Sequence, residues 1–380
     1  MHIQVHQDKV DELLDVILPR WASTPKKYPF NRPDAIVPQA IIPDELRKDK
    51  YVLACFYFYA CIYMRGGIKS LQAFNALIKM WREYPDFFEP SYAKWLNPTQ
   101  VQEVLKRYIG WDSKAAGINW VWNSRRLHDS WEDNPLLLIK GLRNYDEALR
   151  RIKNKRTKTE IGASGEDGGG FRGFQPKMVS MLLYFYDWEG WLKPRFLYPS
   201  PADFHNYRLG FASGAIVATL DEGRNIRYSE KISEPWRVAV MVYMKKRKAD
   251  PLHVSDALWL FSLTMCGNSP LNTSLKPKTF DDMLSRLSAE EAWDHGQWAM
   301  MNGRKKALLQ TCLICPLLSR CEFAIPARPY YRHGVLELRE RPHVEKHFNL
   351  LHLKEPKPNT VVFDEEVQHI LIEHESRRTP

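Results

Sequence analysis

The sequence predicts a mainly α-helical protein that folds into two packed domains. A chain of 380 residues is long for one compact unit, so two domains are expected. Apolar residues recur at helical spacing through residues 51–129, and strand signals are nearly absent there. Alternation typical of a strand appears in the tail, at residues 335–339. We therefore expect a helical body with a small C-terminal β extension.

Composition and charge narrow the class of protein. With 44% hydrophobic and 26% charged residues, the chain resembles soluble globular proteins rather than disordered ones. A formal net charge of +10 favours a polyanionic partner such as nucleic acid, although a basic surface without such a partner has the same charge. Residues 1–50 lack the apolar core of a signal peptide, and the apolar run 51–64 is too short to span a bilayer. We expect a cytoplasmic protein without a membrane partner, nucleoid-associated if it is bacterial.

Residues 1–50 are predicted to form an arm that packs on another part of the chain, the second lobe. Residues 10–21 carry apolar side chains at helical spacing, and a proline-rich, extended stretch follows as far as Pro43.

Residues 51–197 are predicted to form a first helical lobe. Its helices are expected at residues 51–65, 70–84, 97–108 and 113–129, separated by breaker residues such as Gly66 and Pro90. The run 51–64 is so apolar that it is interpreted as a buried helix. Residues 140–158 are rich in Lys and Arg, and a glycine-rich loop follows at residues 162–170.

The stretch 171–208 carries the candidate chemistry. A glycine turn at Gly173 runs through Pro176 into Lys177, and a helix is expected at residues 177–187. The free amides at such a helix start bind phosphate. After the helix, a proline-rich approach leads to Asp203. Considered singly, Asp203 is more often a helix N-cap or a turn residue, and Lys177 a solvated side chain.

Residues 198–325 are predicted to form a second helical lobe, followed by an extension at residues 326–380. A second basic cluster lies at residues 245–248, and a helix at residues 253–266 delivers Cys266 at its end. Residues 267–311 are interpreted as a polar insertion.

The cysteines indicate a metal or cluster site. The sequence contains six of them: Cys55, Cys61, Cys266, Cys312, Cys315 and Cys321. The first two lie in the apolar run and are interpreted as core residues. The last three form a C-x2-C-x5-C pattern, and Cys266 is the remaining candidate for a fourth ligand. Four thiolates fit either tetrahedral zinc or a [4Fe-4S] cluster, here with a structural role.

Several pieces of the chain, in order, resemble the helix-hairpin-helix DNA glycosylase superfamily of the endonuclease III type. The family's G-x-G-x-K hairpin is similar to residues 173–177, with Gln175 in place of the second glycine. Its V-D-x-H-x-x-R segment is similar to residues 202–208, and its G-x-x-x-K-A turn to residues 110–115. The last three cluster cysteines of the family share the C-x2-C-x5-C spacing. The resemblance covers roughly residues 51–321, with residues 140–170 interpreted as an insertion.

The resemblance implies a two-lobed glycosylase-like fold with an iron-sulfur cluster loop. It makes Asp203 the catalytic acid and places Lys177 where bifunctional members keep a lysine nucleophile. It favours a [4Fe-4S] cluster over zinc, with Cys266 as the first ligand, separated from the others by a long insertion. The residues expected to contact DNA are Arg172, Gly173, Gln175, Lys114, His205 and Arg208.

The activity that the resemblance implies is excision of a modified base from double-stranded DNA. Such an enzyme, acting as a monomer, flips the base into a pocket between two helical domains. Asp203 is expected to stabilise the oxocarbenium sugar or to activate the nucleophile, and attack by Lys177 adds strand cleavage. DNA repair and defence against phage DNA are the biological settings that fit.

Two alternatives remain open at this point. Residues 177–182 and 201–205 also resemble the alpha-glutamyl/putrescinyl thymine pyrophosphorylase group of glycosylase-like proteins, which is associated with hypermodified bases. A protein of that kind transfers an amino acid or a polyamine to a thymine derivative in phage DNA. The other alternative is a DNA-binding protein without catalytic activity.

Overall fold

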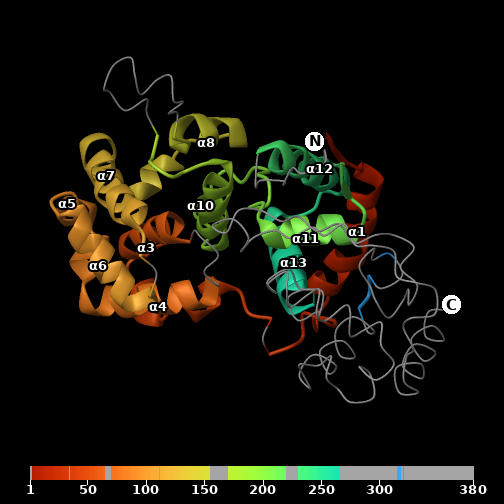
Figure 1. The fold of residues 1–380 in the computed structure, drawn as a ribbon, viewed down its shortest axis with the longest axis horizontal. Coiled ribbons are helices and arrows are strands. Elements are labelled where there is room, and N and C mark those ends of the chain that lie inside the picture. The colour runs from red at the N-terminus through yellow and green to blue at the C-terminus, as the bar shows by residue number, and fades with distance from the viewer. Residues whose placement is uncertain are drawn as a thin grey trace. The chain divides into compact units, whose positions relative to one another are not determined.

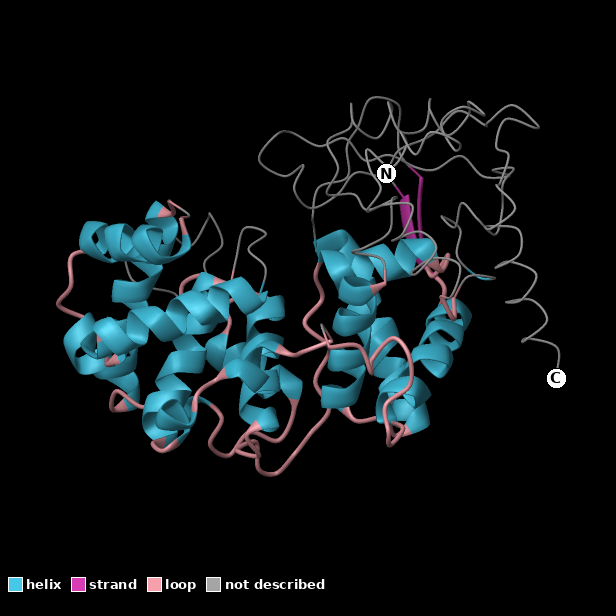
Figure 2. Cartoon of the chain, turned by 90° about the horizontal axis from the view of Figure 1, so that it is seen from below, coloured by secondary structure: helices cyan, strands magenta, loops and turns pink. Residues whose placement is uncertain are grey.

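The computed structural model describes residues 2–33, 35–64, 70–110, 112–154, 170–219, 230–265, 315–317 and 320. Within these residues the protein has twelve α-helices and one pair of short strands (Figures 1 and 2). The predicted mainly α class is therefore confirmed. The predicted C-terminal β extension lies outside the described residues. None of the helices in the described ranges is long and apolar enough to cross a membrane.

The chain divides into two compact units. Unit 1 comprises Met1–Ala35, Ala202–Ala249 and Asp256–Pro380, and unit 2 comprises Ile36–Pro201 and Asp250–Ser255. The chain thus passes from unit 2 to unit 1 four residues after residue 197, where the sequence places the end of the first lobe. Residues 36–50, expected in the N-terminal arm, group with unit 2.

Unit 2 consists of helices joined by short connections. In chain order the elements are η1 Pro38–Ile41, α2 Asp44–Arg47, α3 Lys50–Tyr63, α4 Ser70–Glu83, η2 Pro85–Phe88, α5 Pro90–Ala93, α6 Pro98–Ile109, α7 Lys114–Trp131, η3 Pro135–Leu138, α8 Tyr145–Ile152 and α10 Pro176–Trp188, where η denotes a 3₁₀ helix. Helices α3, α4, α6 and α7 match the four helices predicted between residues 51 and 129. Residues 145–152 of the predicted basic insertion form α8.

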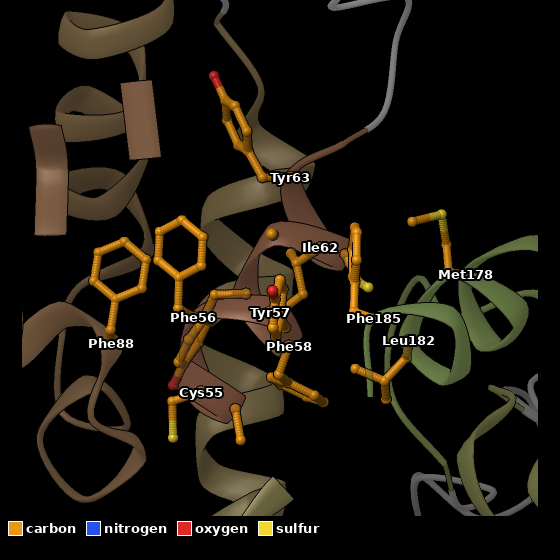
Figure 3. Close-up of a cluster of buried hydrophobic side chains, with 14 of the residues drawn as sticks. Cys55, Phe56, Tyr57, Phe58, Ile62, Tyr63, Phe88, Met178, Leu182 and Phe185 are labelled. Atoms are coloured by element: carbon orange, nitrogen blue, oxygen red, sulfur yellow. The ribbon is translucent and has the colours of Figure 1, made fainter. Parts of the chain in front are cut away.

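Helix α3 is the centre of the unit 2 core, as its composition predicts. Asp49 caps its start by accepting hydrogen bonds from the backbone N–H groups of Tyr51 and Val52, at 2.7 and 3.2 Å. Every side chain from Leu53 to Tyr63 is buried, so α3 is covered on all sides. Figure 3 shows its aromatic rings between Phe88 and the side chains of α10. Tyr57 stacks on Phe185 of α10 with ring centroids 4.8 Å apart, which joins the two helices.

The turn between α6 and α7 depends on glycine at two positions. Gly110 ends α6 in the left-handed region, with a φ of +73°, where a side chain is strained. Gly117 lies in the second turn of α7, where an added Cβ atom would meet the carbonyl oxygen of Pro98 at 2.2 Å. The missing side chain therefore permits the close approach of α7 to α6.

The segment after α10 is fixed by a network around Arg195. Its guanidinium donates two hydrogen bonds, of 2.6 and 2.7 Å, to the buried carboxylate of Asp187, and two more to Asp250. The Tyr198 hydroxyl donates to Asp187 as well, and burial raises the pKa of Tyr198 well above its ordinary value. A buried carboxylate with this many donors is fully compensated. The network holds the chain between α10 and Pro201 in place.

Unit 1 is built from helices and the strand pair. Its elements are β1 His2–Val5, α1 Gln7–Ala22, α11 Phe204–Ala212, β2 Ile216–Thr219, α12 Glu230–Arg247 and α13 Pro251–Thr264, although the first five residues of α13 group with unit 2. The strands are antiparallel, with Ile3 opposite Ala218. Neither strand nor the helix α12 is predicted from the sequence.

Helices α1 and α12 are held together by acidic and basic side chains. Lys246 contacts Asp11 at 2.7 Å, and Arg247 contacts Asp15 at 2.6 Å. Burial raises the pKa of Asp11, but hydrogen bonds from Lys246 and Gln7 outweigh it, so the pKa is lowered overall. Two members of the basic cluster 245–248 are therefore engaged within unit 1.

Candidate nucleic-acid interface

The turn before α10 has the backbone geometry that its glycines predict. Gly170 and Gly173 have φ angles of +74° and +83°, in the left-handed region. At Gly170 an added Cβ atom would lie 2.0 Å from the carbonyl oxygen of Lys153, so no other residue fits without movement. Sequence and structure agree on a tight turn that enters α10.

Backbone hydrogen bonds close this turn against the end of α8. The N–H of Phe171 donates to the carbonyl of Ile152 at 3.0 Å, and the N–H of Asn154 donates to the carbonyl of Phe174 at 2.8 Å. Phe171 and Phe174 are buried and contact Phe58 of α3, with centroids 5.2 and 5.1 Å apart. The turn is thus anchored in the core on both sides of Arg172.

Asn123 of α7 holds the tip of the turn. Its Nδ2 donates to the carbonyl of Arg172 at 2.9 Å, and its Oδ1 accepts from the N–H of Arg172 at 2.7 Å. Asn123 is 1% exposed, so both hydrogen bonds are shielded from water. The pair fixes the backbone of Arg172, a half-buried residue.

The Arg172 side chain lies over the indole of Trp122. Its guanidinium carbon is 3.9 Å from the ring centroid, within the range of a cation–π contact. Trp122 is one residue before Asn123 on α7, so one helix positions both the backbone and the side chain of Arg172. A cation oriented in this way at a turn is suited to contact a phosphate.

The start of α10 has no side-chain cap. Gln175 is the N-cap residue, it is exposed, and its side chain makes no capping hydrogen bond. The N–H groups of Met178 and Val179 donate to its carbonyl instead. Lys177, half-buried, lies in the first turn. The partial positive charge of a helix N-terminus and two basic side chains therefore meet at this turn.

Lys114 lies at the start of α7, in the same unit. It is exposed, and the preceding Ser113 caps the helix by accepting a hydrogen bond from the N–H of Ala116 at 3.2 Å. The neighbouring Asp112 pairs with Lys106, whose hydrogen bond, together with one from Gln102, lowers the pKa of the Asp112 carboxyl.

Asp203 lies at the start of α11, in unit 1. Its Oδ1 accepts hydrogen bonds from the N–H of His205 at 2.9 Å and from the N–H and Nδ2 of Asn206 at 3.4 and 3.3 Å. Asn206 in turn accepts from the indole N–H of Trp236 at 3.2 Å. Asp203 is therefore an N-cap, which is the common role of an aspartate considered without its neighbours. Its exposed fraction is 9%.

Two of the residues expected to contact DNA, His205 and Arg208, follow Asp203 in the chain. The Nδ1 of His205 lies 3.3 Å from the hydroxyl oxygen of Ser262, and its ring contacts Trp259 edge to face. Both His205 and Ser262 are buried. Arg208 belongs to α11, but its side chain is outside the described part of the structure.

The predicted cluster ligands fall mostly outside the described residues. Cys266, Cys312 and Cys321 lie there, whereas Cys315 is described and half-buried. Within the described ranges no group of His, Cys, Asp and Glu side chains is arranged to hold a metal ion. The cluster stays a prediction from the cysteine spacing. By contrast Cys55 is buried in α3, and this burial raises the pKa of its thiol, as expected for a core residue.

A second basic feature lies on α8. An open pocket is lined by Gly141, Arg143, Glu147, Arg150 and Arg151. Glu147 pairs with Arg143 at 2.7 Å, and Arg151 donates to the carbonyl of Lys140 at 2.8 Å. Arg150 is exposed. The basic segment predicted at residues 140–158 thus presents guanidinium groups on the surface of the unit that carries the turn.

No protein-family model, no curated protein and no solved structure matches the chain.

Three contacts of the site are not predictable from the motifs. Asn123 and Trp122 belong to a helix expected only from its apolar spacing, and Arg172 lies 49 residues away in the chain. The hydrogen bond from Trp236 to Asn206 joins α12, which the sequence does not predict, to the residue beside His205. The polar Asn123 within a helix expected from its apolar spacing is a signal that points to such contacts.

Proposed function

We propose that the protein binds DNA and excises a modified base by cleaving its N-glycosidic bond. The observation that carries the proposal is the burial and hydrogen bonding of Asp203. The capping residues Asp49, Asn97 and Asn144 are exposed, whereas Asp203 is nine-tenths buried and held by three hydrogen bonds at one oxygen. A buried carboxylate in a fixed orientation is preorganised to stabilise positive charge that develops beside it.

The proposed reaction places that positive charge on the sugar. As the bond between C1′ and the base nitrogen breaks, its electron pair leaves with the base, which takes up a proton. The charge of Asp203 stabilises the oxocarbenium ion, and the oxygen of a water molecule bonds to C1′ and loses a proton. The products are a free base and an abasic strand. If the amine of Lys177 attacks C1′ instead of water, the base leaves with the electron pair of the broken bond and takes one proton from the nitrogen. The C1′–O4′ bond then opens, O4′ takes the second proton, and the Schiff base that forms allows elimination of the 3′ phosphate, which cleaves the strand.

The proposed DNA contact rests on the turn before α10. Arg172 is held at the tip of the turn, the helix start carries partial positive charge, and the α8 pocket presents further guanidinium groups. Phosphate contacts of this kind position a duplex without reading its sequence.

Salt-dependent binding is the first test of this proposal. The affinity for a duplex is expected to fall steeply between about 50 and 200 mM salt, because bound phosphates release counterions. Arg172→Glu should weaken binding to all sequences alike, whereas Lys79→Glu, an exposed change on α4, serves as the matched control. Binding is measured by fluorescence anisotropy, and free base by chromatography with duplexes that carry different modified pyrimidines. Affinity that does not depend on salt contradicts the DNA contact.

The cysteine pattern predicts that the purified protein contains iron. The spacing of Cys312, Cys315 and Cys321, with Cys266 as the fourth ligand, suits a [4Fe-4S] cluster that stabilises the fold. We expect a yellow-brown protein with broad visible absorption, and loss of iron in Cys312→Ala. Cys55→Ala, which removes a core thiol, should retain iron. Zinc without iron after anaerobic preparation contradicts the cluster.

A further inference from the structure

A row of aromatic and basic side chains extends from the residues just after α5 to the turn before α10. We call it the aromatic strip, and its members are Trp95, Lys94, Arg125, Trp122 and Arg172. All five belong to unit 2, in which α5 and α7 pack together (Figure 1).

Each member of the strip contacts or neighbours the next. The Nζ of Lys94 lies 4.9 Å from the centroid of the Trp95 ring, and the Nε of Arg125 donates to the carbonyl of Lys94 at 2.9 Å. Trp122 lies three residues before Arg125 on α7, which places both on one face of the helix. Arg172 then covers part of Trp122. The strip is therefore continuous up to the turn.

The indoles of the strip remain open to solvent. Trp95 is 78% exposed, more than any other large hydrophobic side chain among the described residues, and Trp122 is 38% exposed. A tryptophan so exposed contributes little to the core, because apolar surface stabilises a fold only when it leaves water. Exposed aromatic rings beside basic groups are instead typical of binding surfaces.

The basic side chains of the strip suit an anionic partner. Within the described residues neither Lys94 nor Arg125 is ion-paired with a carboxylate, so both are available to an anion. An indole offers a face to any base, and cations beside it neutralise the phosphates on either side. A duplex hides its base faces by stacking, whereas a single strand presents them. We infer that the aromatic strip binds a single strand of nucleic acid.

This inference rests on the proposed function only in taking DNA as the partner. A single strand laid along the strip reaches Arg172, so it continues onto the turn that is proposed to hold a duplex. The strip therefore extends the DNA contact to unpaired nucleotides next to the bound duplex.

Substitution of the two tryptophans tests the strip in the full-length chain. We measure binding of a labelled oligothymidine of about 12 nucleotides by anisotropy, since single-strand sites commonly span about 4 to 16 nucleotides. Trp95→Ala and Trp122→Ala are each expected to weaken binding about tenfold, as loss of one stacked base does. Lys94→Gln should weaken it less and reduce the salt dependence. Ile36→Ala, an exposed apolar change in unit 2, and Lys79→Ala are the controls.

Unfolding curves and base release separate the outcomes. Trp95→Ala should have the same free energy of unfolding as the parent protein, because the Trp95 side chain is mostly in water. Weaker oligothymidine binding by this variant supports the strip even if no base is ever released, since stacking is independent of the Asp203 chemistry. Equal binding by Trp95→Ala and the parent overturns the inference, and the exposed indole then serves another class of partner.

Discussion

Asp203→Asn is expected to slow base release strongly while leaving DNA binding unchanged. A preorganised charge acts on the transition state and little on the ground state, so its removal lowers the rate by about 10² to 10³. The rate is measured in single-turnover reactions, and the affinity by anisotropy with the same duplex.

The fold should tolerate this substitution. Asn retains an oxygen that accepts the hydrogen bonds now made to the Asp203 Oδ1 by the N–H groups of His205 and Asn206. Asp203→Ala, by contrast, removes the cap as well and is expected to lower the free energy of unfolding by about 1 kcal/mol. The two variants therefore distinguish the charge of Asp203 from its capping role.

Asp49→Asn is the matched control for Asp203→Asn. Asp49 caps α3 with the same two-donor geometry, but it is exposed. The Asp49→Asn variant should release base as fast as the parent protein. If Asp203→Asn is equally fast, Asp203 is an N-cap only, and the stretch from the turn to α11 is a DNA-binding fold without this chemistry.

Asn123→Ala is expected to lower both stability and DNA affinity. Truncation removes both hydrogen bonds to the backbone of Arg172, at a position that is 1% exposed. Loss of shielded hydrogen bonds and the small cavity left behind should lower the free energy of unfolding by about 2 to 3 kcal/mol. Because the Arg172 backbone is no longer fixed, the duplex affinity should fall about tenfold.

Ser124→Ala provides the comparison for this effect. Ser124 is the next residue on α7, and its hydroxyl is hydrogen-bonded to Tyr59 and to the carbonyl of Trp120, away from the turn. It should lose stability and keep DNA affinity. Denaturant unfolding and anisotropy measure the two quantities. Equal affinities for Asn123→Ala and Ser124→Ala, both below the parent, mean that the affinity follows global stability and not the fixed turn.

Local patterns made part of the fold predictable. The helices α3, α4, α6 and α7 follow from apolar spacing between clear breakers, and α10 from the turn before it. The sequence does not predict the helix α12, because Pro235 and charged residues at both ends interrupt its apolar period.

The parts of the structure that the sequence does not predict depend on contacts between residues far apart in the chain. The strands β1 and β2 have four residues each and pair across more than two hundred positions, and strands so short carry almost no signal of their own. Among the candidate residues, Lys177 of unit 2 and Asp203 of unit 1 follow from motifs, whereas the contacts of Asn123 and Trp122 with Arg172 arise only when α7 packs beside the turn.

The mass of the DNA strand after incubation with the protein tests the central proposal most directly. A duplex carrying one modified pyrimidine is incubated with excess protein, and each strand is weighed by mass spectrometry. Excision by water predicts an abasic strand and a free base, and attack by Lys177 predicts a cleaved strand with an adduct that borohydride traps. Across a panel of modified bases, strands that keep their mass, or that gain the mass of an added group with the sugar intact, would contradict base excision.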